Sequence, residues 1–369
     1  MERRYELCNG DRLVCTEGAA VFTFTGARAV LSTAANGGGL RYDLTSAFNW
    51  SDQGTAGICQ PMEGATLREH QIAVARRLGL DPDHTTGLDT AANLDNMVVV
   101  TKEWEGLRVT AAVSAGADVN ALCAGDTATL TERAGAPCPV PAGTINIFLF
   151  TDRALSPGAM AELLLTATEA KTAVLRDLMQ GSSVSSALAT GTGTDGAVIV
   201  CAAEGERLLN AGKHFKFGEL AAGAVREAVA EALFRQTGLC PKSQHSVLKR
   251  LGRFGITAHS LRARCLAQLP GEEAAFAARL ERLDRDSFLV AAAALYVHLL
   301  DQRAAGMLTG DEAGDWAGHL LGEIARHCHC PAPDGPGEAT PERLEDCLAG
   351  ILCAALREGR RLYPSEKPI

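Results

Sequence analysis

The sequence predicts an α/β fold, in which a mixed sheet is packed with helices, followed by an all-helical C-terminal region. Short β-type runs alternate with helical segments over the first two-thirds of the chain. From Lys242 onward the residues are mainly Ala, Leu, Arg and Glu at helical spacing, and no β-type run recurs. These patterns indicate two parts with different architectures. We therefore expect an α/β domain at residues 1–238 and a helical extension at residues 239–369.

The strands are predicted from apolar, β-branched runs that turn residues separate. Gly26 separates the first two runs, and Glu105-Gly106 forms a turn between the third and fourth. The run at 144–150 is almost wholly apolar, as in a strand buried on both faces. The predicted strands cover 19–25, 27–33, two segments within 96–116, 144–150 and 197–203.

The helices are predicted from apolar residues at helical spacing and from their end signals. Residues 62–80 form an amphipathic pattern that Gly79 closes, and Ser156-Pro157 is a favourable start for a helix reaching Met179. A further helix is expected from Phe217 to Gln236. Each of these helices can cover a face of the sheet.

Composition excludes several classes of function. The 369-residue chain has a net charge of −9, which is unlike a nucleic-acid-binding surface, because phosphate recognition requires clustered cations. Its longest apolar run, residues 288–300, is shorter than the ~20 residues that span a bilayer. The N-terminal segment has no apolar core of the signal-peptide type. We expect a cytoplasmic protein with no membrane or nucleic-acid partner.

The cysteines do not predict a metal centre. The sequence contains 12 cysteines but no C-x-x-C pair. Only the segment His327–Cys330 is dense in metal-ligating residues, and adjacent residues cannot easily occupy four corners of a tetrahedron. We therefore expect no metal, and activity that survives dialysis against a chelator.

A glycine-rich loop at residues 189–196 is the most informative segment. Gly191, Gly193 and Gly196 match the dinucleotide-binding pattern G-x-G-x-x-G, but they precede a β-type run, whereas that fingerprint follows a strand and opens a helix. A phosphate cradle is thus disfavoured. The loop is instead a candidate for polar chemistry, since it also carries Thr190, Thr192, Thr194 and Asp195.

Several ordered motifs resemble the adenosylcobinamide amidohydrolases, enzymes of corrinoid salvage. The motifs are LSTAANGGG (31–39), TGLDTAAN (86–93), VSAGADVNALCAGD (113–126), GTINIFLF, TATEAK, ATGTGTDG and GKH…GE. The resemblance covers about residues 15–235 and not the last third. It implies a catalytic domain that hydrolyses the amide joining aminopropanol to the corrin ring. The corrinoid would be the substrate, and no cofactor is expected.

Lys171 is a candidate catalytic residue. It lies in the apolar stripe of the helix that follows Pro157. Because lysines are rarely buried unless paired, its ammonium either extends to solvent or meets a carboxylate, for which Asp195 is a candidate. Glu169 is on the other side of that helix, and only the resemblance makes it a substrate-binding candidate.

His214 is the candidate general base, because histidine changes charge near neutral pH. If it has this role, His214→Ala should lower turnover about a hundredfold or more. The alternative is a loop histidine that bonds its neighbours. Lys213 beside it is a substrate-binding candidate, although Gly212-Lys213 is not a P-loop.

Polar residues near the ends of the strands complete the predicted site. Asn36, in a glycine-rich loop, is a candidate oxyanion donor. Asn120 and Asn146 flank or enter apolar runs, where each either binds the corrin side chains or bonds the backbone. The remaining substrate-binding candidates are Ser32, Thr33, Gly38, Thr190, Thr192 and Thr194. Ser32 and Thr33 are also candidate nucleophiles, although no adjacent base can be assigned to either from the sequence.

The sequence is also compatible with two other functions. One is an autoprocessed amidohydrolase in which Thr144 becomes an N-terminal nucleophile. Thr144-Ile145-Asn146 is equally typical of the ordinary start of a strand, so we expect one intact chain of 38.7 kDa. The other is a corrinoid-binding or delivery protein without catalysis.

The C-terminal region is expected to pack against the catalytic domain or a second subunit. An isolated helical tail would expose a large apolar patch. Truncation after Thr237 should therefore cost solubility or oligomeric state. The apolar residues concerned are Phe288, Leu289, Tyr296, Leu299 and Leu300.

Overall fold

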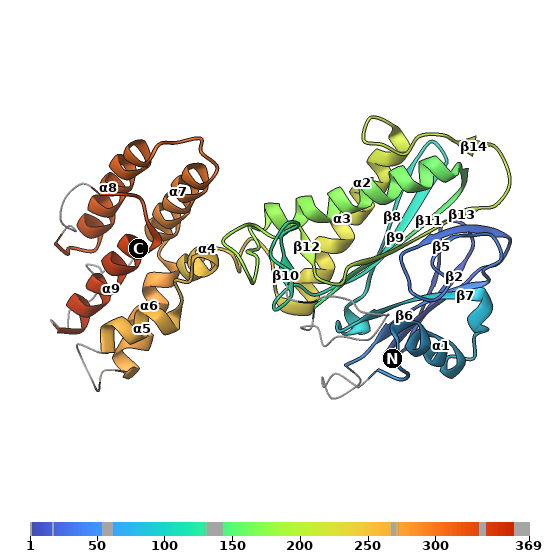
Figure 1. Cartoon of the computed structure of the whole chain (residues 1–369), viewed down its shortest axis with the longest axis horizontal. Coiled ribbons are helices and arrows are strands. Elements are labelled where there is room, and N and C mark those ends of the chain that lie inside the picture. The colour runs from blue at the N-terminus through green and yellow to red at the C-terminus, as the bar shows by residue number, and fades with distance from the viewer. Residues whose placement is uncertain are drawn as a thin grey trace, which may run out of the picture. The chain divides into compact units, whose positions relative to one another are not determined.

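The computed structural model describes residues 2–16, 18–53, 62–128, 130, 143–266, 271, 273–331 and 337–357. The chain divides into two compact units, Met1–Cys240 and Pro241–Ile369 (Figure 1). The first unit contains mixed sheets with packed helices, and the described part of the second contains helices and no strand. The predicted fold class is confirmed.

The described part of the first unit contains two main sheets, a short β-ribbon and three α-helices. Its strands are β1 (Arg3–Glu6), β2 (Arg12–Thr16), β3 (Ala19–Thr23), β4 (Arg28–Ser32), β5 (Gly39–Arg41), β6 (Ser46–Ser51), β7 (Thr85–Thr90), β8 (Val98–Trp104), β9 (Leu107–Ala115), β10 (Ala121–Leu122), β11 (Ile145–Leu155), β12 (Gly191–Thr192), β13 (Gly196–Ala202) and β14 (Arg207–Leu208). Its helices are α1 (Leu67–Arg77), α2 (Pro157–Asp177) and α3 (Lys216–Thr237), with short 3-10 turns at Pro82–His84 and Leu94–Asn96.

Each main sheet combines antiparallel and parallel pairs. The five-stranded sheet has the order β1-β2-β3-β6-β7, in which only β6 and β7 run parallel. The seven-stranded sheet has the order β5-β4-β13-β11-β9-β8, and β14 pairs beside β11. In this sheet β11 runs parallel to β13 and β14. The ribbon pairs β10 with β12.

The two sheets pack face to face, as strand β11 illustrates. Successive side chains of a strand point to opposite faces. Ile147 and Leu149 join the core beneath α2 and α3, whereas Phe148 and Phe150 join the core between the sheets. The rings of Phe148 and Phe150 stack on Phe22 of β3, with centroids 4.5 Å and 5.2 Å away.

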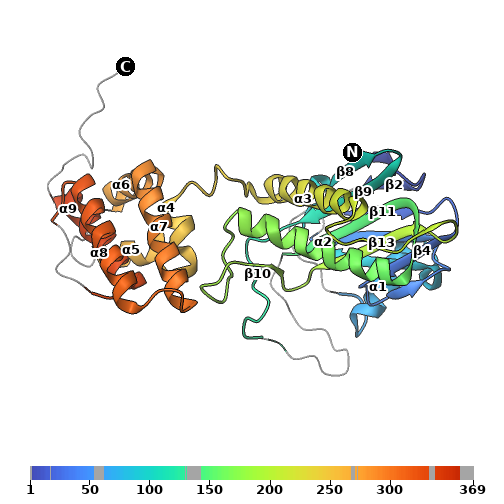
Figure 2. The ribbon, with the colours of Figure 1, turned by 90° about the horizontal axis from the view of Figure 1, so that it is seen from above.

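Helices close both outer faces of this sandwich (Figures 1 and 2). Helices α2 and α3 cover the seven-stranded sheet, and the core there includes residues of β9, β11 and α3. Helix α1 lies beside β7 and covers the other sheet through Val74 and Ala75, which pack on Phe48. The result is a four-layer α-β-β-α arrangement.

Local end signals account for most predicted boundaries. Ser156 caps α2 by accepting a hydrogen bond from the N–H of Ala159. Helix α1 begins later than predicted, because Thr66 is its N-cap. Gly26 does lie between two strands, but β3 and β4 belong to different sheets, so the chain crosses between layers there.

The second unit is a bundle with its own core. Its described helices are α4 (Val247–Leu251), α5 (Ala258–Leu266), α6 (Glu273–Arg285), α7 (Ser287–Ala304), α8 (Gly310–His327) and α9 (Pro341–Arg357), with a 3-10 turn at Gly252–Phe254. Leu289, Tyr296 and Leu300 are buried within this bundle, and Tyr296 donates a hydrogen bond to the carbonyl of Thr340 at 2.8 Å. Most of the apolar face expected to need another partner is thus covered by the neighbouring helices.

None of the described helices combines the length and the apolar character that crossing a membrane would require.

Candidate active site

Polar side chains gather at one edge of the sandwich, where β11 and β13 begin and β7 ends. Asn146 of β11 pairs in register with Gly196 of β13. A methyl group added at Gly196 would lie 2.8 Å from Leu88 of β7, so the three strands meet closely here. We call this region the polar edge. Its members are Gln71, Asp89, Asn146, Lys171 and Asp195.

Lys171 and Asp195 form a buried ion pair at the polar edge. The sequence left open whether Lys171 extends to solvent or meets a carboxylate, and the structure has the second arrangement. Asp195 accepts further hydrogen bonds from the N–H of Ile145 and the N–H of Thr192, each at 3.0 Å. The hydroxyl of Thr192 also donates to it, at 2.5 Å.

The carboxylate of Asp195 and the ammonium of Lys171 differ in how much of their hydrogen-bonding capacity is already used. Both oxygens of Asp195 accept hydrogen bonds from protein donors. The Lys171 ammonium has three N–H donors. Among the described residues it uses one of them, toward Asp195. It can therefore donate to a ligand at this edge.

Close approach explains the spacing of the glycines in the 189–196 loop. A side chain at Gly191 would lie 2.3 Å from the Asp195 carboxylate and 2.8 Å from the Lys171 ammonium. At Gly193 it would lie 2.9 Å from the Asn120 side chain. The glycines thus make room for side chains and do not form the start of a helix, as the sequence predicted.

The hydroxyls of this loop bond to neighbouring protein groups. The Thr194 hydroxyl bonds to that of Thr144 and to the carbonyl of Gly143. Asn120 donates to the same carbonyl at 2.9 Å. The Thr190 hydroxyl accepts from the N–H of Ala124 at 2.8 Å.

Asn146 connects the two sheets. Its side-chain amide donates to the Asn49 side chain of β6 and to the backbone carbonyl of Asp89, both at 2.9 Å. Asn49 in turn donates to Ser114 at 2.8 Å. Of the two roles that the sequence left open, the structure gives Asn146 protein partners.

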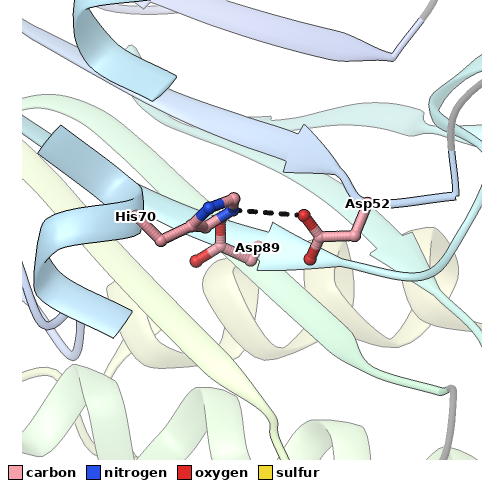
Figure 3. A group of neighbouring side chains, drawn as sticks. All are labelled: Asp52, His70 and Asp89. Atoms are coloured by element: carbon pink, nitrogen blue, oxygen red, sulfur yellow. Dashed lines mark hydrogen bonds and ion pairs between the residues drawn. The ribbon is translucent and has the colours of Figure 1, made fainter. Parts of the chain in front are cut away.

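A second polar group, Asp52, His70 and Asp89, lies beside this connection (Figure 3). His70 on α1 places Nε2 at 3.2 Å from Oδ1 of Asp52 and 3.5 Å from Oδ1 of Asp89. Oδ1 of Asp89 is buried and accepts no hydrogen bond from the described residues. The other oxygen of Asp89 accepts from Gln71 at 2.7 Å.

The spacing of these three side chains would admit a metal ion, but the hydrogen bonding opposes it. Their ligand atoms lie within 4.8 Å of one another, and in the described part of the chain no other such group is found, including at His327–Cys330. Nδ1 of His70 accepts the N–H of Glu63 at 3.0 Å. The proton of a neutral ring therefore lies on Nε2, the atom that faces the carboxylates, whereas a ligand nitrogen must be unprotonated.

The burial of this group changes its proton affinity. Burial raises the pKa of Asp89 to about 7, although Gln71 acts in the opposite direction. The hydrogen bond with Asp52 raises the pKa of His70. The Asp89 carboxyl group, with a pKa of about 7, can therefore exchange a proton close to neutral pH.

Gln71 links the Asn36 loop to the polar edge. Its side-chain oxygen accepts the N–H of Asn36 at 2.8 Å while its amide holds Asp89. The Asn36 side chain donates to the carbonyls of Pro82 and Thr85, at 2.9 and 3.2 Å. Both of its N–H donors are thus occupied, which does not favour the predicted oxyanion role.

The predicted residues near Asn36 are likewise engaged. Ser32 shares a hydrogen bond of 2.7 Å with Thr86, and Thr33 accepts the N–H of Ala197 at 3.0 Å. A side chain at Gly38 would lie 2.0 Å from the carbonyl of Ala34. These contacts shape the loop and provide no evident nucleophile.

His214 is not part of the polar edge. It is exposed before α3, and no described residue forms a side-chain hydrogen bond with it. Its loop runs along α2 on the side of Glu162 and Glu169: Ala211 donates to Glu162 at 2.6 Å, and Lys213 pairs with Glu169. Glu169 and Lys171 point in directions about 200° apart around the helix. The structure therefore separates His214, Lys213 and Glu169 from the Lys171–Asp195 ion pair.

Asp52, His70, Gln71 and Asp89 were not selected from the sequence. The helix that carries His70 and Gln71 was predicted, and Asp89 lies within the quoted motif TGLDTAAN. The sequence contained no signal that these side chains meet, because they come from three separate segments.

Comparison with known proteins identifies the family of the first unit. The model of the adenosylcobinamide amidohydrolase family matches residues 4–241. The chain belongs to this family. The match ends where the first compact unit ends, so the polar edge of this adenosylcobinamide amidohydrolase family member lies wholly within the matched region.

Individual relatives match shorter segments. An uncharacterized protein of Methanocaldococcus jannaschii, MJ1613, is 35% identical over 181 residues, which are 46% of this chain and 70% of that protein. An adenosylcobinamide amidohydrolase of Halobacterium salinarum is 33% identical over 106 residues, 29% of this chain and 42% of that protein. The PH0078 protein of Pyrococcus horikoshii aligns over 58% of this chain and 77% of its own, with 14% identity and a TM-score of 0.28.

Proposed function

We propose that this protein hydrolyses the amide that joins aminopropanol to the corrin ring of adenosylcobinamide. The products are adenosylcobyric acid and aminopropanol, and one water molecule is consumed. The observation that carries this proposal is the family match over the whole first unit. The released corrinoid could re-enter cobalamin synthesis, which is a salvage role.

The polar edge offers groups suited to amide hydrolysis. Negative charge develops on the amide oxygen as its carbonyl carbon is attacked, and a fixed donor stabilises it. Lys171 is such a donor, because Asp195 holds its ammonium while N–H groups remain for a ligand. Asp89 adds a carboxyl group whose pKa of about 7 suits proton transfer near neutrality.

A direct assay tests the reaction. Purified protein is mixed with adenosylcobinamide, without ATP and after dialysis against a chelator, and released aminopropanol is quantified. We expect stoichiometric release of aminopropanol and adenosylcobyric acid. A strict requirement for a nucleoside triphosphate would contradict the proposal, and activity that zinc restores would transfer the chemistry to a metal-bound water.

The same experiment tests the alternative of a corrinoid-binding protein. Such a protein would bind adenosylcobinamide, as seen by equilibrium dialysis, but would release no aminopropanol. The buried ion pair with unused donors favours the enzyme, because recognition of an amide-rich ring does not require a buried cation.

A further inference from the structure

The peptide bond between Gly143 and Thr144 has an unusual set of hydrogen bonds. The Gly143 carbonyl oxygen accepts from two side chains, Asn120 at 2.9 Å and the hydroxyl of Thr194 at 3.1 Å. Two donors on one carbonyl stabilise the negative charge that develops when its carbon is attacked. They occupy the positions expected of an oxyanion hole directed at the protein's own backbone.

The hydroxyl next to this carbonyl belongs to a connected proton path. A threonine hydroxyl has a single hydrogen to donate. Because Thr194 donates its hydrogen to Gly143, the bond between the two threonine hydroxyls is donated by Thr144. The path therefore runs from the Thr144 hydroxyl through the Thr194 hydroxyl to the Gly143 oxygen.

The backbone on both sides holds this arrangement in place. Gly143 has φ +132°, which residues with a side chain rarely adopt, and a Cβ there would lie 3.1 Å from the Asn120 side chain. On the other side, the carbonyl of Thr144 accepts the N–H of Gly116 at 3.0 Å, and Ile145 is held by Asp195. Thr144 itself is buried, with 5% of its surface exposed.

We propose that the chain cleaves its own Gly143–Thr144 peptide bond. The Thr144 oxygen attacks the Gly143 carbonyl carbon, and its proton passes through Thr194 to the carbonyl oxygen and then to the departing nitrogen. The C–N bond breaks, leaving an ester between Gly143 and the Thr144 oxygen. Water then hydrolyses the ester to the Gly143 carboxylate and a free Thr144 hydroxyl, so that one water is consumed overall.

Cleavage would leave a threonine with a free amine at the polar edge. Such an amine can act as base for its own hydroxyl, which makes the residue a nucleophile toward amides. This consequence rests on the proposed function, since it would supply the nucleophile for the corrinoid amide. The two pieces would stay associated, because β11 remains paired with β9 along Ile145–Thr151.

The sequence alone favoured an intact chain, since residues 144–146 are typical of the start of a strand. The hydrogen bonds at Gly143 favour the opposite outcome. An ordinary strand start requires no pair of side-chain donors on the preceding carbonyl, and no hydroxyl chain that ends there.

Intact-mass measurement of the purified full-length chain tests the proposal. After incubation at neutral pH we expect two fragments in place of the 38.7 kDa chain, the second beginning Thr-Ile-Asn-Ile. Thr144→Ala should remain intact, Thr144→Ser should cleave, and Thr194→Val should slow cleavage by at least about tenfold. Thr168→Ala, an exposed threonine of α2, is the matched control and should cleave like the wild type.

Two results would overturn the proposal of self-cleavage. A wild-type chain that circular dichroism shows to be folded, yet that stays at one mass, overturns the proposal. Fragments that persist in Thr144→Ala also overturn it, because they would come from a contaminating protease. Since no corrinoid enters the measurement, the result is independent of whether adenosylcobinamide is the substrate.

Discussion

At the scale of single residues, the site is explained by how each charge is satisfied. Asp195 receives hydrogen bonds from Lys171, Thr192 and Ile145, so protein donors surround its carboxylate. Asp89 has a buried oxygen with no donor among the described residues, and its proton affinity rises accordingly. Two carboxyl groups at one edge thus have different surroundings: Asp195 is surrounded by donors, and Asp89 is buried with one oxygen that accepts no hydrogen bond from the described residues.

The Lys171 ammonium can be tested by Lys171→Met, which keeps the apolar stripe of α2. Asp195 retains its bonds from Thr192 and Ile145, so the fold should survive. We expect aminopropanol release to fall about a hundredfold or more, as for the loss of an oxyanion donor. Lys102→Met, a lysine of β8 that pairs with Glu227, is the control. Full activity in Lys171→Met would reduce the residue to a structural role.

For His214, the predicted general base, the structure leads to a different expectation. Because His214 is exposed and lies on another side of α2 from Lys171, His214→Ala should leave the turnover number close to that of the wild type. Steady-state kinetics decide this point. A hundredfold loss would restore the original assignment and would require the loop to move toward the ion pair.

The proton affinity of Asp89 predicts a pH dependence of stability. Its pKa is about 7 in the folded chain and about 3.9 when unfolded, so the folded state binds more protons between these values. The stabilisation is complete below about pH 4 and is lost as pH rises through about 7. Asp89→Asn should therefore gain stability relative to the wild type between about pH 5 and pH 8, by roughly 4 kcal/mol at most.

Chemical denaturation at about pH 5 and at about pH 8 measures the free energy of unfolding of the wild type and of Asp89→Asn. Asp118→Asn is the exposed control. His70 also has a raised pKa, and its contribution is lost in the same direction as pH rises. It remains in the variant, so the comparison isolates Asp89 and its coupling to His70. Parallel pH curves for the wild type and Asp89→Asn would show that Asp89 titrates as an ordinary carboxyl group.

At the scale of elements, short segments with weak sequence signals position the site. Strand β7 reads Thr-Thr-Gly-Leu-Asp-Thr, which lacks apolar alternation, yet Thr85 and Thr86 are buried through hydrogen bonds with Ser46 and Ser32. The two-residue strand β12 aligns the glycine-rich loop against β10. Such strands form because neighbouring strands supply their hydrogen-bond partners, and not because their residues have a high β-propensity.

The packing of β12 against the ion pair can be tested by Gly191→Ala. The added methyl group would overlap the Asp195 carboxylate and crowd the Lys171 ammonium. We expect a loss of about 1–3 kcal/mol in stability together with most of the activity. Gly223→Ala, in helix α3 with no atom within 4 Å of the added methyl, should be neutral or stabilising. Equal behaviour of the two variants would contradict the close approach.

At the scale of the whole molecule, each unit has a hydrophobic core of its own. The first core lies between the sheets and under α2 and α3, and the second surrounds Tyr296. Domains with separate cores can fold alone. The helical unit therefore does not need the first unit to cover its apolar faces, which was the reason for expecting insolubility after truncation.

We accordingly expect a chain ending at Cys240 to remain soluble and to unfold cooperatively. It contains every residue of the polar edge, so aminopropanol release should persist as well. Size-exclusion chromatography and thermal unfolding of the truncated and full chains make the comparison. Aggregation of the truncated chain would show that the helical unit is required for solubility, as the sequence first suggested.

The sequence by itself determined the features that local patterns control. Apolar periodicity located α2 and α3, the Ser156 cap set where α2 begins, and a lysine in an apolar stripe required a partner. Tertiary structure decided which groups meet. It paired Lys171 with Asp195, left His214 exposed, and assembled Asp52, His70 and Asp89 from three segments. Hydrogen bonding and burial between distant segments set these properties, and neither is visible in the spacing of residues along the chain.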